Sequence, residues 1–250
     1  MTPLKALDLS WHEGHLAVFL PIILATVFFI VFWFTSKSGK VKDWFYRRAD
    51  ADEASVNHIT FNRVVGFAAM GVMPALVLML ALPGTTLASL GLKHSADTAL
   101  FSLIWTLILS ALVIPLALVS ARKPKNLVNY PQIRARVWTN RIVLINALGW
   151  ALYLFGYEFL FRGVLLFPLV EQMGVWPAIA VNIALYSATH IPKGLEETIG
   201  AIPLGLVLCL LTLASGTIWI AFLVHLAMAW TNSFTALKFH PDIHYQKSRI

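Results

Sequence analysis

The sequence predicts an all-α membrane protein, a polytopic bundle of about seven transmembrane helices that forms a single membrane domain over residues 1–250. Hydrophobic residues make up 58% of the chain, which exceeds the roughly 45–50% typical of soluble domains. They gather in runs close to the roughly 20 residues that an α-helix needs to cross a bilayer. These two observations argue against a water-soluble fold.

Three long runs without a charged residue predict the first three helices, because a helix satisfies its own backbone polar groups in lipid. A fourth run is interrupted only by Glu158 and Arg162, and three shorter runs follow it. The expected helices are residues 16–35, 64–82, 98–120, 142–170, 175–188, 199–215 and 217–237. No basic n-region with a cleavage site precedes the first run, so we expect it to remain as an anchor.

The distribution of basic residues predicts the orientation of the helices. Formal charge is +7, and most basic residues fall after the first and third helices, with others after the fifth and seventh. On that side lie Lys37, Lys40, Lys42, Arg47, Arg48, Arg122, Lys123, Lys125, Arg134, Arg136, Arg141, Lys193, Lys238, Lys247 and Arg249, whereas the other side holds Lys5 and Lys93. The positive-inside rule then places the N-terminus outside and the C-terminus in the cytoplasm. The charge therefore indicates orientation rather than nucleic-acid binding.

The connections between helices are short, and none predicts a soluble domain. Residues 41–58 mix aromatic and basic side chains and are expected to lie on the membrane surface. Residues 121–132 contain Pro124 and Pro131 and predict an extended connection on the same side. Short loops and a strong charge bias favour a bacterial inner (cytoplasmic) membrane, with the lipid bilayer as the surrounding partner.

Four ionisable residues within the apolar second half are candidates for function, namely Glu158, Arg162, His190 and His225. A charge at the centre of a membrane helix costs about 2.5–3.5 kcal/mol on insertion scales, so such residues are functional candidates by default. Glu158 precedes Arg162 by four residues, which places both on one helix face in the favourable order for an ion pair. A buried pair that only fixes helix packing is the other interpretation.

The number of residues from the expected turn places His190 and Glu158 at the same depth in the membrane. Gly174 is the expected turn between the fourth and fifth helices, and Glu158 and His190 each lie 16 residues from it, or roughly 24 Å along each helix. His225 lies nine residues after the expected turn at Gly216, and helix tilt can bring it level. A carboxylate with two histidines can hold and deprotonate water and stabilise an oxyanion. This set predicts hydrolysis of a peptide bond.

The motifs resemble those of the CPBP family, the intramembrane glutamic endopeptidases that include type II CAAX prenyl proteases and bacterial Abi proteins. The family pattern is Glu-Glu-x-x-x-Arg, Phe-x-x-x-His and His-x-x-x-Asn. The corresponding segments are Tyr157-Glu158-Phe159-Leu160-Phe161-Arg162-Gly163, Tyr186-Ser187-Ala188-Thr189-His190 and His225-Leu226-Ala227-Met228-Ala229. The resemblance covers roughly residues 141–237 and implies a protease core there, with a membrane-associated protein or peptide as substrate. The substrate need not be prenylated.

The resemblance implies a role for each site residue. Glu158 would act as general base or water-holder, with His190 as its partner. His225 would stabilise the oxyanion and Arg162 would orient Glu158. No cofactor is expected.

Two positions depart from the family pattern. Tyr157 occupies the place of the first glutamate, which in the family is taken to activate water, and Ala229 occupies the place of the asparagine. Asn232 is a poor substitute for that asparagine, because it lies roughly 10 Å further along the helix than His225. Glu197, preferred over Glu196, is a candidate that could reach back toward His190. Both acids also suit the start of a helix.

Two alternatives use the same residues. One carboxylate and two histidines form a possible zinc set with an open fourth position, although no His-Glu-x-x-His segment is present. A non-catalytic binding or immunity protein with the same fold is the second alternative, and it is supported by Tyr157 and Ala229. A transporter is disfavoured because the helices show no inverted repeat.

Overall fold

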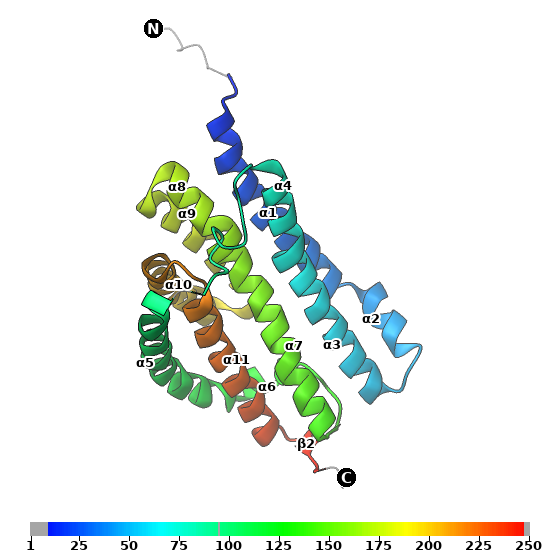
Figure 1. Cartoon of the computed structure of the whole chain (residues 1–250). Helices are drawn as coiled ribbons and strands as arrows, with labels where there is room; N and C mark the ends of the chain where they lie inside the picture. The colour runs from blue at the N-terminus through cyan, green and yellow to red at the C-terminus, as the bar shows by residue number, and fades with distance from the viewer. Residues whose placement is uncertain (1–9, 95, 248–250) are drawn as a thin grey trace, which may run out of the picture.

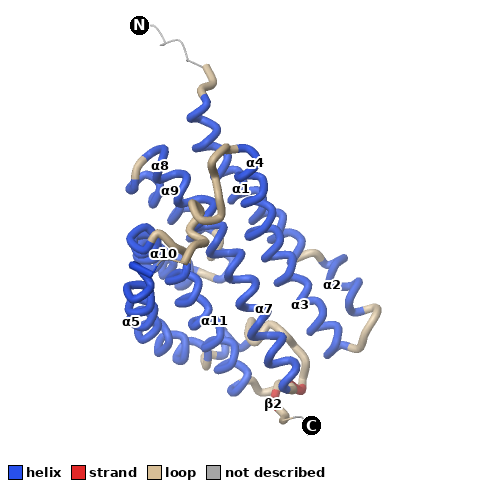
Figure 2. Tube along the Cα trace, in the orientation of Figure 1, coloured by secondary structure: helices blue, strands red, loops and turns tan. Residues whose placement is uncertain are grey.

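The computed structural model describes residues 10–94 and 96–247, which fold into a bundle of helices (Figures 1 and 2). The first half contains α1 (Glu13–Ser36), α2 (Gly39–Tyr46), α3 (Ala51–Phe67), the π-helical stretch η1 (Ala68–Val72), α4 (Met73–Ala81), α5 (Ala96–Ala121) and α6 (Pro124–Leu127). The second half contains β1 (Val137–Trp138), α7 (Asn140–Glu158), the π-helical stretch η2 (Phe159–Leu166), α8 (Phe167–Met173), α9 (Val175–Ala188), the 3₁₀ turn η3 (Ile191–Lys193), α10 (Leu195–Ser215), α11 (Trp219–Phe239) and β2 (His244–Tyr245).

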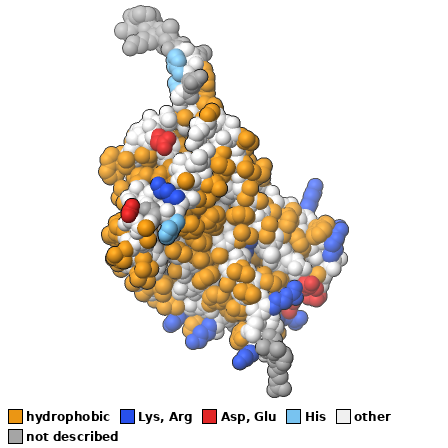
Figure 3. All heavy atoms as spheres, viewed as in Figure 1, with side chains coloured by type: hydrophobic (Ala, Val, Ile, Leu, Met, Phe, Trp, Pro, Cys, Tyr) orange, Lys and Arg blue, Asp and Glu red, His pale blue; other side chains and the backbone are white. Residues whose placement is uncertain are grey.

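The predicted fold class is confirmed: the protein is an all-α polytopic membrane protein. Within the described residues, six helical segments are long and apolar enough to cross a membrane. They are Gly14–Ser36, Ala51–Ala81, Ala96–Ala121, Asn140–Met173, Leu195–Ser215 and Trp219–Phe239. On the face in Figure 3, hydrophobic side chains form a broad band, and most of the charged side chains gather around the lower end and the right-hand edge.

The fifth expected helix, α9, is shorter than a full membrane crossing. Its 14 residues rise only about 21 Å at 1.5 Å per residue. It still reverses the chain direction, because it lies side by side with α8 (Figure 1). The helix α1 begins at the end of the bundle opposite β2. Gly174, with φ of 81°, makes the turn that the sequence predicts before α9.

The second spanning helix begins 13 residues earlier than hydropathy predicts. The Asp50 side chain accepts hydrogen bonds from the backbone N–H groups of Asp52 and Glu53 and so caps α3. The helix therefore starts at Ala51 and includes residues that expectation assigned to a surface segment. Arg63, which lies between that segment and the expected start of the helix at residue 64, is buried.

Two π-helical stretches contact each other within the bundle. The stretch η1 follows α3, and η2 follows α7. The stretch η2 begins directly after Glu158, and all eight of its residues are buried. The stretch η1 continues α3 and packs against α7 and η2. Such stretches are rare and occur frequently at functional sites, and here η2 carries Arg162.

The end of the bundle that carries the two short strands is closed by a separate apolar cluster. The strands β1 and β2 pair in parallel, with Val137 opposite His244 and Trp138 opposite Tyr245. Beneath them, Trp138 packs with Ile133, Leu237 and Ile243. We refer to this as the β1–β2 end. Under the predicted orientation it faces the cytoplasm.

Candidate functional site

Glu158 and Arg162 form the predicted ion pair at the junction of α7 and η2. Arg162 Nε donates to Glu158 Oε2 at 3.2 Å, and both side chains are 0% exposed. A buried charge is costly unless a partner and hydrogen bonds compensate it. The pair is therefore a fixed element of the interior rather than a surface contact.

The second oxygen of Glu158 contacts His225 of α11. His225 Nδ1 donates to Glu158 Oε1 at 2.7 Å, because a carboxylate can only accept. Equal depth predicts a meeting of Glu158 with His190 instead, yet within the described chain the imidazole bonded to Glu158 is that of His225. Residue counts give the depth of a side chain along its helix but not its direction around the helix axis. The helix α11 lies on the side of Glu158 Oε1.

Arg162 has further partners that sequence reasoning missed. Its Nη1 donates to Asn182 Oδ1 at 2.5 Å and lies 3.0 Å from Cys209 Sγ, and its guanidinium stacks over Tyr186 at 4.5 Å. Asn182 in turn donates to the carbonyl of Phe161 at 2.6 Å. The available signal for Asn182 was an amide inside the apolar run 175–188. Cys209 is also part of this polar cluster.

His190 follows α9 and is held by main-chain and side-chain groups of the same segment. Its Nδ1 lies 2.9 Å from the carbonyl oxygen of Tyr186 and 3.2 Å from Thr189 Oγ1. Thr189 Oγ1 also lies 2.7 Å from the hydroxyl oxygen of Tyr157. The chain thus links His190 to α7 through Tyr157 rather than through Glu158.

Tyr157 lies between the two histidines. Its ring centroid is 6.4 Å from that of His190 and 5.7 Å from that of His225, both edge-on. Neither histidine Nε2 has a hydrogen-bond partner within the described residues, and neither is among the fully enclosed unpartnered atoms. Both Nε2 atoms are therefore accessible, whereas Glu158 is not. The site presents two imidazoles, backed by a buried carboxylate.

The remaining sequence candidates lie outside this cluster. Glu197 pairs with Lys193 at 3.8 Å, and Glu196 with Lys125 at 4.0 Å, so these acids form exposed ion pairs at the start of α10. Asn232 accepts from Asn126 Nδ2 at 2.9 Å, toward the β1–β2 end. Ala229 packs beside the apolar cluster of Trp150, Leu154 and Leu226.

The donor groups around Glu158 bond to one another. In residues 10–94 and 96–247, no group of three His, Cys, Asp or Glu side chains is arranged to hold a metal ion. The carboxylate oxygens of Glu158 are instead engaged by Arg162 and His225.

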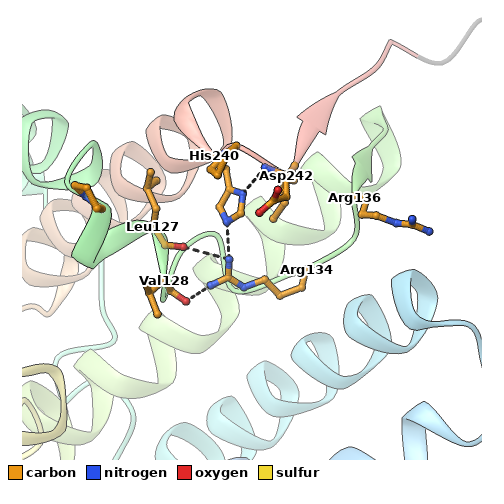
Figure 4. Close-up of a pocket in the computed structure, with 9 residues that line it drawn as sticks. Leu127, Val128, Arg134, Arg136, His240 and Asp242 are labelled. Atoms are coloured by element: carbon orange, nitrogen blue, oxygen red, sulfur yellow. Dashed lines mark hydrogen bonds between the residues drawn. The ribbon is translucent and has the colours of Figure 1, made fainter.

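A cavity of about 500 Å³ lies at the β1–β2 end and does not include the site residues. Arg134 and His240 point toward each other there, whereas Arg136 points away (Figure 4). Arg134 Nη1 donates to His240 Nε2 at 2.9 Å, and the same guanidinium donates to the carbonyls of Leu127 and Val128. Burial, with a further contribution from Arg134, lowers the pKa of His240. The contacts tie the loop before β1 to the segment after α11.

Arg63 is a second buried cation, in the first half of the chain, where sequence reasoning expected none. Its guanidinium donates to the carbonyl and side-chain oxygens of Asn146, each at 2.9 Å, and stacks over Trp150 at 4.7 Å. Asn146 Nδ2 also donates to Ser233 Oγ at 3.1 Å. This cluster joins α3, α7 and α11 and contains no carboxylate, which distinguishes it from the Glu158 site.

The fold and this cluster together define a polytopic membrane protein with an internal Glu–Arg–His site. Residues 137–231 match the family model described as type II CAAX prenyl endopeptidase Rce1-like. This part of the chain is therefore similar to the CAAX protease family, and the matched region contains Glu158, Arg162, His190 and His225. No curated protein and no solved structure matches the chain.

Proposed function

We propose that the protein is an intramembrane endopeptidase that hydrolyses a peptide bond of a membrane-associated protein or peptide. The observation that carries the proposal is the pair of accessible imidazoles on either side of Tyr157, one of them bonded to the buried carboxylate of Glu158. The match to a family of membrane endopeptidases supports it. The bilayer is the other partner, and no nucleic acid is proposed.

His190 is the group proposed to accept a proton from water. Its Nδ1 faces the carbonyl of Tyr186, which can only accept, so Nδ1 carries the proton and neutral Nε2 carries a lone pair. The water oxygen attacks the substrate carbonyl carbon while one water proton passes to Nε2. The same proton then goes to the leaving amine as the C–N bond breaks.

His225 is the group proposed to stabilise the oxyanion. In its protonated form it donates from Nδ1 to Glu158 and from Nε2 to the oxygen that becomes negative during attack. Removing one such donor costs about 10²–10³ in rate in a well-studied hydrolase. Glu158 then acts by orienting His225, as the buried acid of a catalytic triad does, and Arg162 holds Glu158.

Cleavage of a proteome-derived peptide mixture by the purified protein in detergent tests the proposal. We expect Glu158→Gln, His190→Ala and His225→Ala each to abolish cleavage while the protein still inserts and purifies as a single species. Glu171→Gln and His244→Ala are matched controls, because both side chains are exposed and outside the site. Wild-type cleavage no greater than that of the triple variant would refute the proposal.

A metal-free reaction is part of this proposal. We expect cleavage to persist after dialysis against a chelator and elemental analysis to find no near-stoichiometric zinc. Loss of cleavage that added zinc restores would instead favour the His₂Glu zinc alternative.

A non-catalytic binding or immunity protein is the second candidate, and one observation favours it. Both oxygens of Glu158 are engaged and the side chain is 0% exposed, while Ala229 offers no side-chain donor. In that case Glu158→Gln would leave a cellular phenotype intact, whereas substitutions around the pair that disturb packing would destroy it. The endopeptidase predicts that Glu158→Gln alone removes the phenotype.

A further inference from the structure

Thr189 lies between the Tyr157 hydroxyl and the His190 imidazole. Its Oγ1 is 2.7 Å from the Tyr157 hydroxyl and 3.2 Å from His190 Nδ1. It also donates to the carbonyl oxygen of Tyr186 at 2.7 Å. One hydroxyl thus contacts three groups from α7 and from the end of α9.

The directions of these hydrogen bonds follow from the chemistry of the Tyr186 carbonyl, which can only accept. The Thr189 proton is directed to that carbonyl, so the Tyr157 hydroxyl must donate its own proton to Thr189 Oγ1. The proton on His190 Nδ1 is shared between the Tyr186 carbonyl and Thr189 Oγ1. The protons of Tyr157, Thr189 and His190 Nδ1 are therefore all donated to other groups of this network.

Tyr157, Thr189 and His190 together thus offer a water molecule two hydrogen-bond acceptors and no donor. The Tyr157 O–H donates to Thr189, which leaves an oxygen lone pair free to accept, and neutral His190 retains a lone pair at Nε2. At the position where the family pattern has an acid, the chain therefore presents an uncharged acceptor. A phenol oxygen in this state can orient water by accepting one hydrogen bond, although it cannot deprotonate it.

We propose that Thr189 is a positioning residue that fixes the Tyr157 hydroxyl and the His190 imidazole as two hydrogen-bond acceptors for the attacking water. The inference rests on the proposed endopeptidase function. One water O–H donates a hydrogen bond to the Tyr157 oxygen and stays intact, and the other proton is transferred to His190 Nε2 during attack. The water oxygen forms the new bond to the substrate carbon.

Kinetics of Thr189 variants test this inference. We expect Thr189→Val, which keeps the shape but loses the hydroxyl, to lower kcat on the order of tenfold to a hundredfold, as small misplacements of catalytic groups do. KM should change little, because the proposed role concerns water rather than the substrate. Thr189→Ser should restore most of kcat. Thr60→Val is the matched control, since Thr60 makes the same kind of contact, to Val56 O at 2.8 Å, away from the site.

A double-substitution cycle separates positioning from packing. If Thr189 acts through Tyr157 and His190, Thr189→Val combined with Tyr157→Phe should lose little more than the more damaging single change. An unchanged kcat in Thr189→Val, a loss in Thr189→Ser equal to that in Thr189→Val, or losses that simply multiply would each overturn the inference. Thermal unfolding of each variant shows whether it folds.

A second readout does not depend on activity. In protein labelled with ¹⁵N-histidine and ¹³C-tyrosine, we expect Thr189→Val to shift the His190 Nδ1 and Tyr157 Cζ resonances, and Thr189→Ser to keep both close to wild type. Absence of these shifts overturns the positioning role even if the protein cleaves peptides. Inactive wild-type protein with the expected shifts refutes the endopeptidase instead.

Discussion

Arg162 shows how much of a buried charge's environment is supplied by residues far away in sequence. Glu158 is one helical turn away, but Asn182, Cys209 and the Tyr186 ring come from α9 and α10. The i, i+4 spacing predicts the Glu158 contact because it depends only on helix geometry. The other contacts depend on how three segments pack, which no local pattern encodes.

Asn182→Ala should destabilise the protein, because it removes one acceptor from Arg162 and leaves the Phe161 carbonyl without its donor. Buried groups left unsatisfied cost about 1–3 kcal/mol each, and more where a charge is involved. Thermal or denaturant unfolding in detergent measures the effect. Asn126→Ala is the matched control, since Asn126 is only half-buried and bonds to Asn232. Equal midpoints for the two variants would contradict this account.

The close approach of α7 to the segment formed by α3 and η1 sets the position of the site. Gly156 of α7 lies against the backbone of Phe67, and a Cβ added there would lie 2.9 Å from Phe67 Cα and 3.2 Å from its carbonyl oxygen. On the opposing stretch, a Cβ at Gly71 would lie 3.1 Å from Gly156 Cα. Small residues permit such contacts between membrane helices. Glu158 lies only two residues after Gly156.

Gly156→Ala should therefore lower stability and displace the site. Because the colliding atoms are backbone, the helices must separate, at a cost of about 1–3 kcal/mol as in other overpacked cores. Unfolding in detergent and the cleavage assay give the two readouts. Gly200→Ala, at a helical glycine with open space around it, should be neutral or slightly stabilising. A Gly156→Ala protein as stable as Gly200→Ala would show that the contact is not tight.

The charge distribution along the chain predicts how the bundle is oriented in the membrane. Lys40 in α2 and Gln172 in α8 are both exposed and lie in segments toward opposite ends of the bundle (Figure 1). Among the basic residues assigned to the outer side, Lys5 lies outside the described residues, as does Arg249 on the other side. The positive-inside rule predicts that the α2 side is cytoplasmic.

Labelling of single engineered cysteines tests this orientation. With a membrane-impermeant maleimide added to intact cells, Gln172→Cys should react, whereas Lys40→Cys should react only after permeabilisation. The unsubstituted chain is the control, because its one cysteine, Cys209, is buried. The reverse pattern would show that the basic side faces outward.

Hydropathy and helix periodicity are enough to predict the fold class, most of the spanning segments, the turns at Gly174 and Gly216, and the Glu158–Arg162 pair. These features depend on the cost of exposing backbone to lipid and on contacts within one helix turn. Hydropathy missed the start of α3 at Ala51 and the burial of Arg63. A hydropathy pattern registers neither the cap that Asp50 supplies nor the hydrogen bond between Arg63 and Asn146.

The packing of α11 against α7 sets which histidine bonds to Glu158. Equal residue counts place Glu158 and His190 at one depth, but the direction of each side chain around its helix axis and the packing of α11 bring His225 to the carboxylate. The same packing places Thr189 between Tyr157 and His190. Contacts between helices depend on rotation and separation, and neither is written in the spacing of residues along one chain segment.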